Sequence, residues 1–269
     1  MPSSGMPRQL RRAVLLLSFA LLALASVSLA AAQAGTPNPI TEEGEKIGEL
    51  WVFTLIIAGI VFFAVEGALI YAIIRYRKKN DELPKQTHGS TIIEFIWTGI
   101  PVLIVIALFT YSIIVLRDIE NEADPQDLTI NVRGFQFSWQ FEYALNDLGT
   151  NNDPAAEGAI TIIGNAAQEP ELVIPVGEPV EFALASSDVI HAFYVRDFLY
   201  KLDVVPGRDN RFVITANETG EFFGQCAELC GLDHALMRFR LRVVERDEFD
   251  AWVAENAPAP EEEAVANAD

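Results

Sequence analysis

The two cysteines of the 269-residue chain lie four positions apart in the segment GQCAELCGLDHALM, as Cys226 and Cys230. His234 follows four residues after the second cysteine, and Met237 follows three residues after that histidine. Only one other histidine, His191, lies in the carboxyl-terminal half of the sequence. Thiolate, imidazole and thioether groups are soft metal ligands, so these five residues form a candidate metal site.

Three kinds of site fit the two cysteines. A disulfide is common in exported proteins, but here it closes a very short loop and leaves His234 and Met237 without a purpose. A Cys2His2 zinc site has the right number of ligands, although zinc makes no use of a thioether. Copper uses every member of the set, as in the electron-transfer sites of β-sandwich cupredoxins. Two thiolates on one loop can bridge two copper ions, which predicts a binuclear site that relays single electrons.

The amino terminus predicts export. The basic segment MPSSGMPRQLRR precedes an apolar stretch, residues 13–32, that ends near the small-residue pattern Ala32-Gln33-Ala34. We therefore interpret residues 1–34 as a secretory signal peptide. An uncleaved anchor is the alternative, because about twenty apolar residues are enough to span a membrane. Either interpretation delivers the following residues to the outer face of a membrane.

Two further apolar stretches predict a transmembrane hairpin within residues 35–120. The expected spans, at about 50–75 and 95–116, are each long enough for a hydrocarbon core of about 30 Å. Because positively charged loops stay inside, the turn of the hairpin is expected in the cytoplasm and both of its ends outside. The positive charge of the turn comes from Arg75, Arg77, Lys78, Lys79 and Lys85.

The sequence after residue 117 predicts an external β-domain. From Arg117 onward the formal charge is about −20, against −19 for the whole chain, which favours solubility and the steering of a basic partner. Short alternating or β-branched runs predict an all-β Greek-key sandwich or barrel over residues 121–256, closed by a helix in RDEFDAWVAENA. Residues 257–269 form an acidic tail with the composition of a disordered segment. The chain has no glycine-rich phosphate loop, no Ser-His-Asp order and no basic patch, so nucleotide chemistry and nucleic-acid partners are not expected.

The sequence resembles subunit II of the haem-copper cytochrome c oxidases, the subunit with the binuclear CuA centre. The resemblance covers roughly residues 45–256 and rests on SSDVIHAFYV, KLDVVPGRDNRF and GQCAELCGLDHALM. It implies a cupredoxin-like external domain, and a magnesium or manganese ion bound by the carboxylate of Glu228 at the boundary with the catalytic subunit. It also implies copper ligation by the backbone carbonyl of Glu228 and by the side chains of His191, Cys226, Cys230, His234 and Met237.

The resemblance further implies that this chain performs one step of a reaction carried out together with other proteins. The chain is expected to accept electrons from a cytochrome c, soluble or membrane-tethered, and to pass them to haem in catalytic subunit I. Reduction of O2 to water, coupled to proton translocation, is then expected in that partner, because the chain has no Cys-x-x-Cys-His haem motif. Subunit III and membrane lipid are further expected partners. The implied location is the bacterial plasma membrane, with the carboxyl-terminal domain on the periplasmic side.

Three more residues acquire expected roles from the resemblance. Glu94, in IIEFIWTGIP, aligns with a family glutamate that opens a proton pathway in the catalytic subunit; the alternative is an interfacial charge at a helix start. In GFQFSWQFEY the family usually has two tryptophans, of which the first is the exposed residue that accepts electrons. This chain has Phe137 at the first position and keeps Trp139 at the second, so both are candidates for electron uptake.

The main alternative of another class is a membrane-anchored copper-delivery or assembly protein. Such proteins have a Cys-x-x-x-Cys pair and a distant histidine, but they have a thioredoxin-like fold and usually one span. The second histidine, Met237 and the two-span hairpin argue against this class. A quinol oxidase subunit II lacks the copper ligands, and nitrous oxide reductase has a large additional domain that is missing here.

Overall fold

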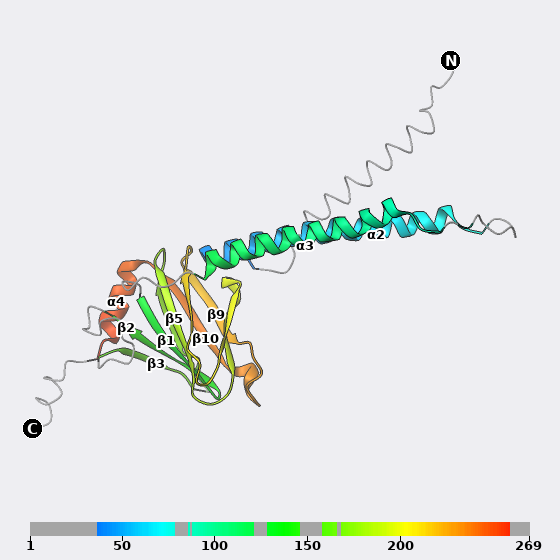
Figure 1. Ribbon diagram of the computed structural model, residues 1–269. Helices are drawn as coiled ribbons and strands as arrows, with labels where there is room; N and C mark the ends of the chain where they lie inside the picture. Colours follow the sequence, from blue (N-terminus) through cyan, green and yellow to red (C-terminus); the bar gives the residue numbers. More distant parts are fainter. Residues whose placement is uncertain are drawn as a thin grey trace, which may run out of the picture. The chain divides into compact units, whose positions relative to one another are not determined.

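The computed structural model describes residues 37–78, 86, 88–120, 128–145, 158–165 and 168–258 (Figure 1). The predicted signal peptide and residues 259–269 of the predicted tail lie outside these ranges, so both remain predictions. The described residues divide into two compact units. One is helical and contains Glu49–Ser112. The other is built on β-strands and contains Pro37–Gly48 together with the chain from Ile113 onward.

Two long apolar helices confirm the predicted hairpin. They are α2 (Glu42–Arg75) and α3 (Thr91–Ile119), and both are long and apolar enough to cross a membrane. They lie side by side (Figure 1). Between them, the ring of Phe53 contacts that of Tyr111 edge to face, with 5.0 Å between centroids. Most side chains of the two apolar spans are exposed, as expected for helices that face lipid or other subunits.

The β-unit is a sandwich of two five-stranded sheets, which confirms the predicted all-β architecture. The strand order is β3-β2-β1-β5-β8 in the first sheet and β4-β10-β9-β6-β7 in the second. Within the described residues, β1 pairs in parallel with β5 and β4 pairs in parallel with β10. The strands of the first sheet are β1 (Leu128–Phe135), β2 (Ser138–Ala144), β3 (Ile160–Ile163), β5 (Pro179–Ser186) and β8 (Asn210–Thr215). Those of the second are β4 (Glu171–Pro175), β6 (His191–Val195), β7 (Tyr200–Val204), β9 (Gly220–Cys226) and β10 (Arg238–Val244).

Aromatic side chains from both sheets fill the space between them. Phe182 of β5 stacks on Phe193 of β6 with 5.4 Å between ring centroids, and Phe141 of β2 contacts Phe239 of β10 at the same separation. All four side chains are almost completely buried. Burial of such a side chain stabilises the fold by about 1.5–3 kcal/mol, so this core is a rigid base for the loops above it.

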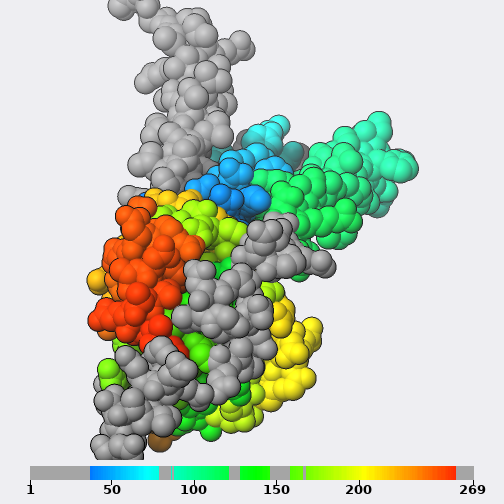
Figure 2. All heavy atoms as spheres, turned by 90° about the vertical axis from the view of Figure 1, so that its left-hand side faces the viewer, coloured from blue at the N-terminus to red at the C-terminus, as the bar shows by residue number. Residues whose placement is uncertain are grey.

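A short helix and one unexpected strand complete the sandwich. Helix α4 (Arg246–Asn256) is the predicted closing helix and is visible in orange on the surface in Figure 2. It buries Phe249 and Trp252, and the Trp252 ring lies 4.8 Å from that of Tyr143. Strand β7 has no counterpart in the sequence prediction. It is a half-exposed edge strand of only five residues, in which Tyr200, Leu202 and Val204 alternate with Lys201 and Asp203.

The chain before α2 belongs to the β-unit. The backbone N–H of Ile40 donates to the carbonyl of Asp197 at 3.0 Å, and the N–H of Asn217 donates to the carbonyl of Ile40 at 2.8 Å. In the first turn of α2, the buried carboxylate of Glu43 accepts the N–H of Thr215 at 3.1 Å. Residues 37–48, which include the first turn of α2, are therefore fixed to the sandwich by directional bonds.

Candidate metal centre

The strand order brings the predicted ligands together. His191 begins β6 and Cys226 ends the neighbouring antiparallel strand β9, in a register that places Phe193 opposite Cys226. The chain then turns through Cys230 and a short 3-10 helix to Met237, directly before β10. A hydrogen bond from the N–H of Cys226 to the carbonyl of Met237, 2.9 Å long, closes this loop at its base. We call residues 226–237 the ligand loop.

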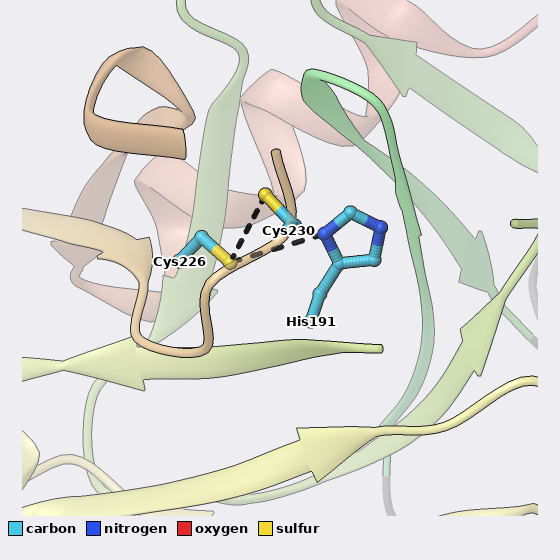
Figure 3. A group of neighbouring side chains, drawn as sticks. All are labelled: His191, Cys226 and Cys230. Carbon is cyan, nitrogen blue, oxygen red and sulfur yellow. Dashed lines mark hydrogen bonds between the residues drawn. The ribbon is translucent and has the colours of Figure 1, made fainter. Parts of the chain in front are cut away.

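The two sulfur atoms lie at the centre of the site. Cys226 Sγ is 3.9 Å from Cys230 Sγ and 3.8 Å from His191 Nδ1. Dashed lines mark both contacts in Figure 3. His234 Nδ1 is 3.6 Å from Cys230 Sγ. The ligand atoms of His191, Cys226 and Cys230 all lie within 4.8 Å of one another, so they can bind a common metal ion.

Two further donors complete the set that the sequence predicted. Met237 Sδ lies 3.8 Å from Cys230 Sγ, and the carbonyl oxygen of Glu228 lies 3.1 Å from Cys226 Sγ. The Met237 side chain is fully buried, whereas Glu228 is exposed. The structure thus brings together all six predicted ligand groups. The backbone carbonyl of Glu228 lies against Cys226 Sγ, whereas Glu228 as a whole is exposed on the surface.

The geometry distinguishes among the three kinds of site. A disulfide requires sulfur atoms about 2.05 Å apart, and these two thiols are free. Metal–sulfur bonds of about 2.3 Å each allow both sulfurs, 3.9 Å apart, to bind the same ion. Zinc would leave the buried thioether of Met237 unused. Copper fits the residues present, because it accepts thiolate, imidazole and thioether together.

The two thiols differ strongly in acidity. Burial is the largest single effect and tends to raise the pKa of Cys226, but hydrogen bonds with His191, with the backbone at Ala192 and Glu228 and with His234 together outweigh it and lower the pKa to about 6. Burial, together with the negative charge of Cys226, raises the pKa of Cys230 to about 12. Only one thiol therefore ionises readily by itself. A bound cation would compensate the second negative charge, so metal binding is expected to release protons.

Asp188 is a site residue that the sequence prediction missed. Its Oδ1 lies 2.9 Å from His191 Nε2, on the side of the ring opposite Cys226. Burial tends to lower the pKa of His191, but Cys226 and Asp188 raise it overall. For Asp188, burial is outweighed by hydrogen bonds from His191 and backbone N–H groups, and its pKa falls. An acid three residues before a ligand histidine was the available signal, since such partners commonly orient ligand imidazoles.

The two candidates for electron uptake lie at different depths. Trp139 has no exposed surface; its ring centroid is 6.1 Å from that of His191, and its Nε1 is 3.5 Å from the Met237 carbonyl oxygen. Phe137 is half-buried and lies against Gly231 in the ligand loop, where an added Cβ would come within 2.9 Å of its ring. A docking protein can therefore touch Phe137, whereas Trp139 is accessible only through other side chains.

Three leucines of the ligand loop are strongly exposed. Leu229, Leu232 and Leu236, all in the ligand loop, are 78%, 93% and 60% exposed. An apolar patch of this kind on a strongly acidic protein is typical of an interaction surface. We call these three side chains the leucine patch.

Glu94 lies in the helical unit, at the start of α3. Its Oε1 accepts the backbone N–H of Ser90 at 3.3 Å, and its own N–H donates to the Ser90 carbonyl at 2.9 Å. This is the geometry of a helix cap, which agrees with the interfacial interpretation of the residue. Its expected part in a proton pathway remains a prediction.

Comparison with known proteins decides the family. Residues 128–244 match the family described as cytochrome c oxidase subunit II, periplasmic domain, and residues 15–115 match its transmembrane domain. The probable cytochrome c oxidase subunit 2 of Streptomyces avermitilis is 35% identical over 243 residues, which cover 80% of this chain and 76% of that protein. The chain belongs to the cytochrome c oxidase subunit II family.

Other members of the subunit II family are similarly related. Cytochrome c oxidase subunit 2 of Alkalihalophilus pseudofirmus is 37% identical over 215 residues, 76% of this chain but only 58% of that longer protein. The crystal structure of the subunit II periplasmic domain from Bradyrhizobium japonicum is 35% identical. It covers 51% of this chain and 96% of that one, with a TM-score of 0.42. Membership of the subunit II family makes this a membrane-anchored part of an oxidoreductase complex with an external carboxyl-terminal domain, and nothing favours the copper-delivery alternative.

Proposed function

We propose that this chain holds a binuclear copper centre and relays single electrons from a cytochrome c to haem in the catalytic subunit of an oxidase. The observation that carries the proposal is the convergence of two free thiols, 3.9 Å apart, with two imidazoles and a buried thioether. When bound, the two copper ions supply a one-electron redox couple shared across both sulfurs.

The protein's own residues perform three tasks at this centre. Cys226, Cys230, His191, His234, Met237 and the Glu228 carbonyl would hold the copper ions. The burial of His191, Met237 and both cysteines excludes water. The closed loop and the sandwich core hold the donors in place, so that little rearrangement accompanies a change of charge. A preorganised environment of this kind favours fast electron transfer.

Electron uptake is proposed at the half-buried Phe137 and at the exposed leucine patch, which lie in or against the ligand loop. Trp139, buried between His191 and the Met237 carbonyl, is proposed as part of the path behind Phe137. The donor is a cytochrome c with a positively charged surface, either soluble or tethered to the membrane. The acidic charge of the chain would steer it to this face.

The remaining partners belong to the same proposal. Subunits I and III would pack against the exposed faces of α2 and α3 in a bacterial plasma membrane, together with lipid. The exposed carboxylate of Glu228 would bind magnesium or manganese at the boundary with subunit I, and Glu94 would serve a proton pathway of that subunit. The reduction of O2 to water and the coupled proton translocation would take place in subunit I.

Metal analysis of the full-length chain, purified in detergent and loaded with copper, tests the proposal. We expect two copper ions per chain and an electron paramagnetic resonance spectrum in which one unpaired electron couples to both nuclei. Cys230→Ser should abolish this spectrum, whereas serine variants of exposed residues in other strands should keep it. One copper per chain, or full occupancy by zinc, would refute the electron-relay function.

A further inference from the structure

The turn between β1 and β2 connects the two segments that carry the metal ligands. The side-chain Nε2 of Gln136, in this turn, donates to the carbonyl of Cys230 at 2.6 Å. The backbone N–H of the same residue donates to Asp188 Oδ2 at 2.7 Å. The other oxygen of that carboxylate lies 2.9 Å from His191 Nε2. One residue therefore contacts both the ligand loop and the carboxylate that orients His191.

We propose that Gln136 is a positioning residue of the metal centre, which sets the placement of His191 relative to Cys230. The inference rests on the proposed function as a copper protein. The ligands belong to the second sheet and its loops, whereas Gln136 extends from the first sheet. Apolar contacts between the sheets are non-directional and tolerate small shifts. The two hydrogen bonds of Gln136 are directional and fix both segments to one point.

Two glycines allow this close approach. Gly231 has a φ of +137°, and a Cβ there would lie 3.0 Å from Gln136 Nε2. Gly134, two residues before Gln136, lies beneath the His191 ring, where a Cβ would come within 3.0 Å of His191 Cδ2. A side chain at either position would push the turn away from a ligand-bearing segment. The backbone at both places is thus adapted to the contact that Gln136 makes.

The two contacts of Gln136 can be tested separately. Substitution of the side chain removes only the bond to the Cys230 carbonyl, because the backbone N–H still reaches Asp188. Without that bond, the ligand loop loses its link to the first sheet at the position of a bridging sulfur. The expected consequences are easier escape of copper and a changed electron distribution between the two ions. Outer partners of this kind typically change metal affinity by about 10–100-fold.

The experiment compares four forms of the full-length chain in detergent after copper loading: wild type, Gln136→Ala, Gln136→Glu and Gln140→Ala. Gln140 lies in the same hairpin but bonds to Glu142, away from the ligands, so it serves as the matched control. We measure the rate of copper loss to a chelator, the copper hyperfine pattern and the reduction potential. Both Gln136 variants should lose copper on the order of 10-fold faster with altered spectra, because alanine and glutamate cannot donate to the carbonyl. Gln140→Ala should match the wild type.

The outcomes separate the inference from the function on which it rests. If the wild type holds two coppers and both Gln136 variants equal it in copper loss, spectrum and potential, the positioning role is wrong and the electron-relay function stands. If the wild type fails to hold two coppers, the function fails and the inference with it. Should Gln136→Ala not fold, Gln136→Asn replaces it, since its amide is one methylene too short to reach the carbonyl. Wild-type behaviour of Gln136→Asn would equally overturn the inference.

Discussion

His191 lies between a thiol and a carboxylate, with Nδ1 3.8 Å from Cys226 Sγ and Nε2 2.9 Å from Asp188 Oδ1. The hydrogen bond to Asp188 places the ring proton on Nε2 and leaves the lone pair of Nδ1 directed at the sulfurs. The imidazole is thus held in the tautomer and orientation that a metal ligand requires.

Replacement of Asp188 by alanine should therefore weaken copper binding without removing a ligand. We expect a loss of affinity of about 10–100-fold, measured by competition with a copper chelator. Glu221→Ala, at an exposed position of β9, is the matched control and should leave the affinity unchanged. Equal affinities of Asp188→Ala and the control would show that the carboxylate does not orient the ligand.

The contact between Asp188 and His191 also predicts how the free energy of unfolding of the metal-free chain depends on pH. The pKa of Asp188 is below its ordinary value of 3.8. The ionised carboxylate therefore stabilises the fold above pH 3.8, and this stabilisation is lost as pH falls through the lowered pKa. The pKa of His191 is above its ordinary value of 6.5. The protonated imidazole therefore stabilises the fold below pH 6.5, and this stabilisation is lost as pH rises through the raised pKa. The stability difference between wild type and Asp188→Asn, followed by thermal unfolding, should be largest between these two values. A difference that does not vary with pH would contradict the prediction.

Met237 should tune the centre more than it stabilises the fold. Leucine has a similar volume, so Met237→Leu should cost less than about 1.5 kcal/mol in the free energy of unfolding. Removal of the sulfur, 3.8 Å from Cys230 Sγ, should nevertheless shift the reduction potential and the copper hyperfine pattern. The shift of the reduction potential is measured by potentiometric titration, followed by visible absorption. Identical potentials in the variant and the wild type would mean that the thioether is not a ligand.

Phe137 should govern the uptake of electrons. Tryptophan at this position adds a larger and more easily oxidised ring at the half-exposed edge of the ligand loop. Phe137→Trp is therefore expected to change the rate of reduction by cytochrome c, measured by stopped-flow absorption. Phe223→Trp, at an exposed position of β9, controls for the added indole and should have no effect. Unchanged kinetics with soluble and membrane-tethered donors alike would exclude Phe137 as the contact residue.

Residue types and spacing were sufficient for much of this structure. The apolar spans predicted two helices because a membrane span must be long and continuously apolar, and α2 and α3 contain them. Alternating runs predicted nearly every strand of the sandwich, since period-two burial is a local property. The exception is β7, where Tyr200, Leu202 and Val204 alternate with Lys201 and Asp203, but a run of five residues is too short to be distinctive without its pairing with β6.

The clustering of soft donors could likewise be expected from the sequence, because such residues at short spacing are rare; the assignment of each as a copper ligand stays a prediction. Three relationships, in contrast, required the tertiary structure. Asp188 lies near His191 along the chain, but only the folded loop directs its carboxylate to Nε2. Trp139 and Phe137 share one apolar pattern, yet burial separates them into an inner and an outer residue. Gln136 and Cys230 are 94 residues apart, and only the packing of two sheets brings them within hydrogen-bonding distance. Local sequence specifies which groups are present, whereas the long-range contacts that orient them arise from the fold as a whole.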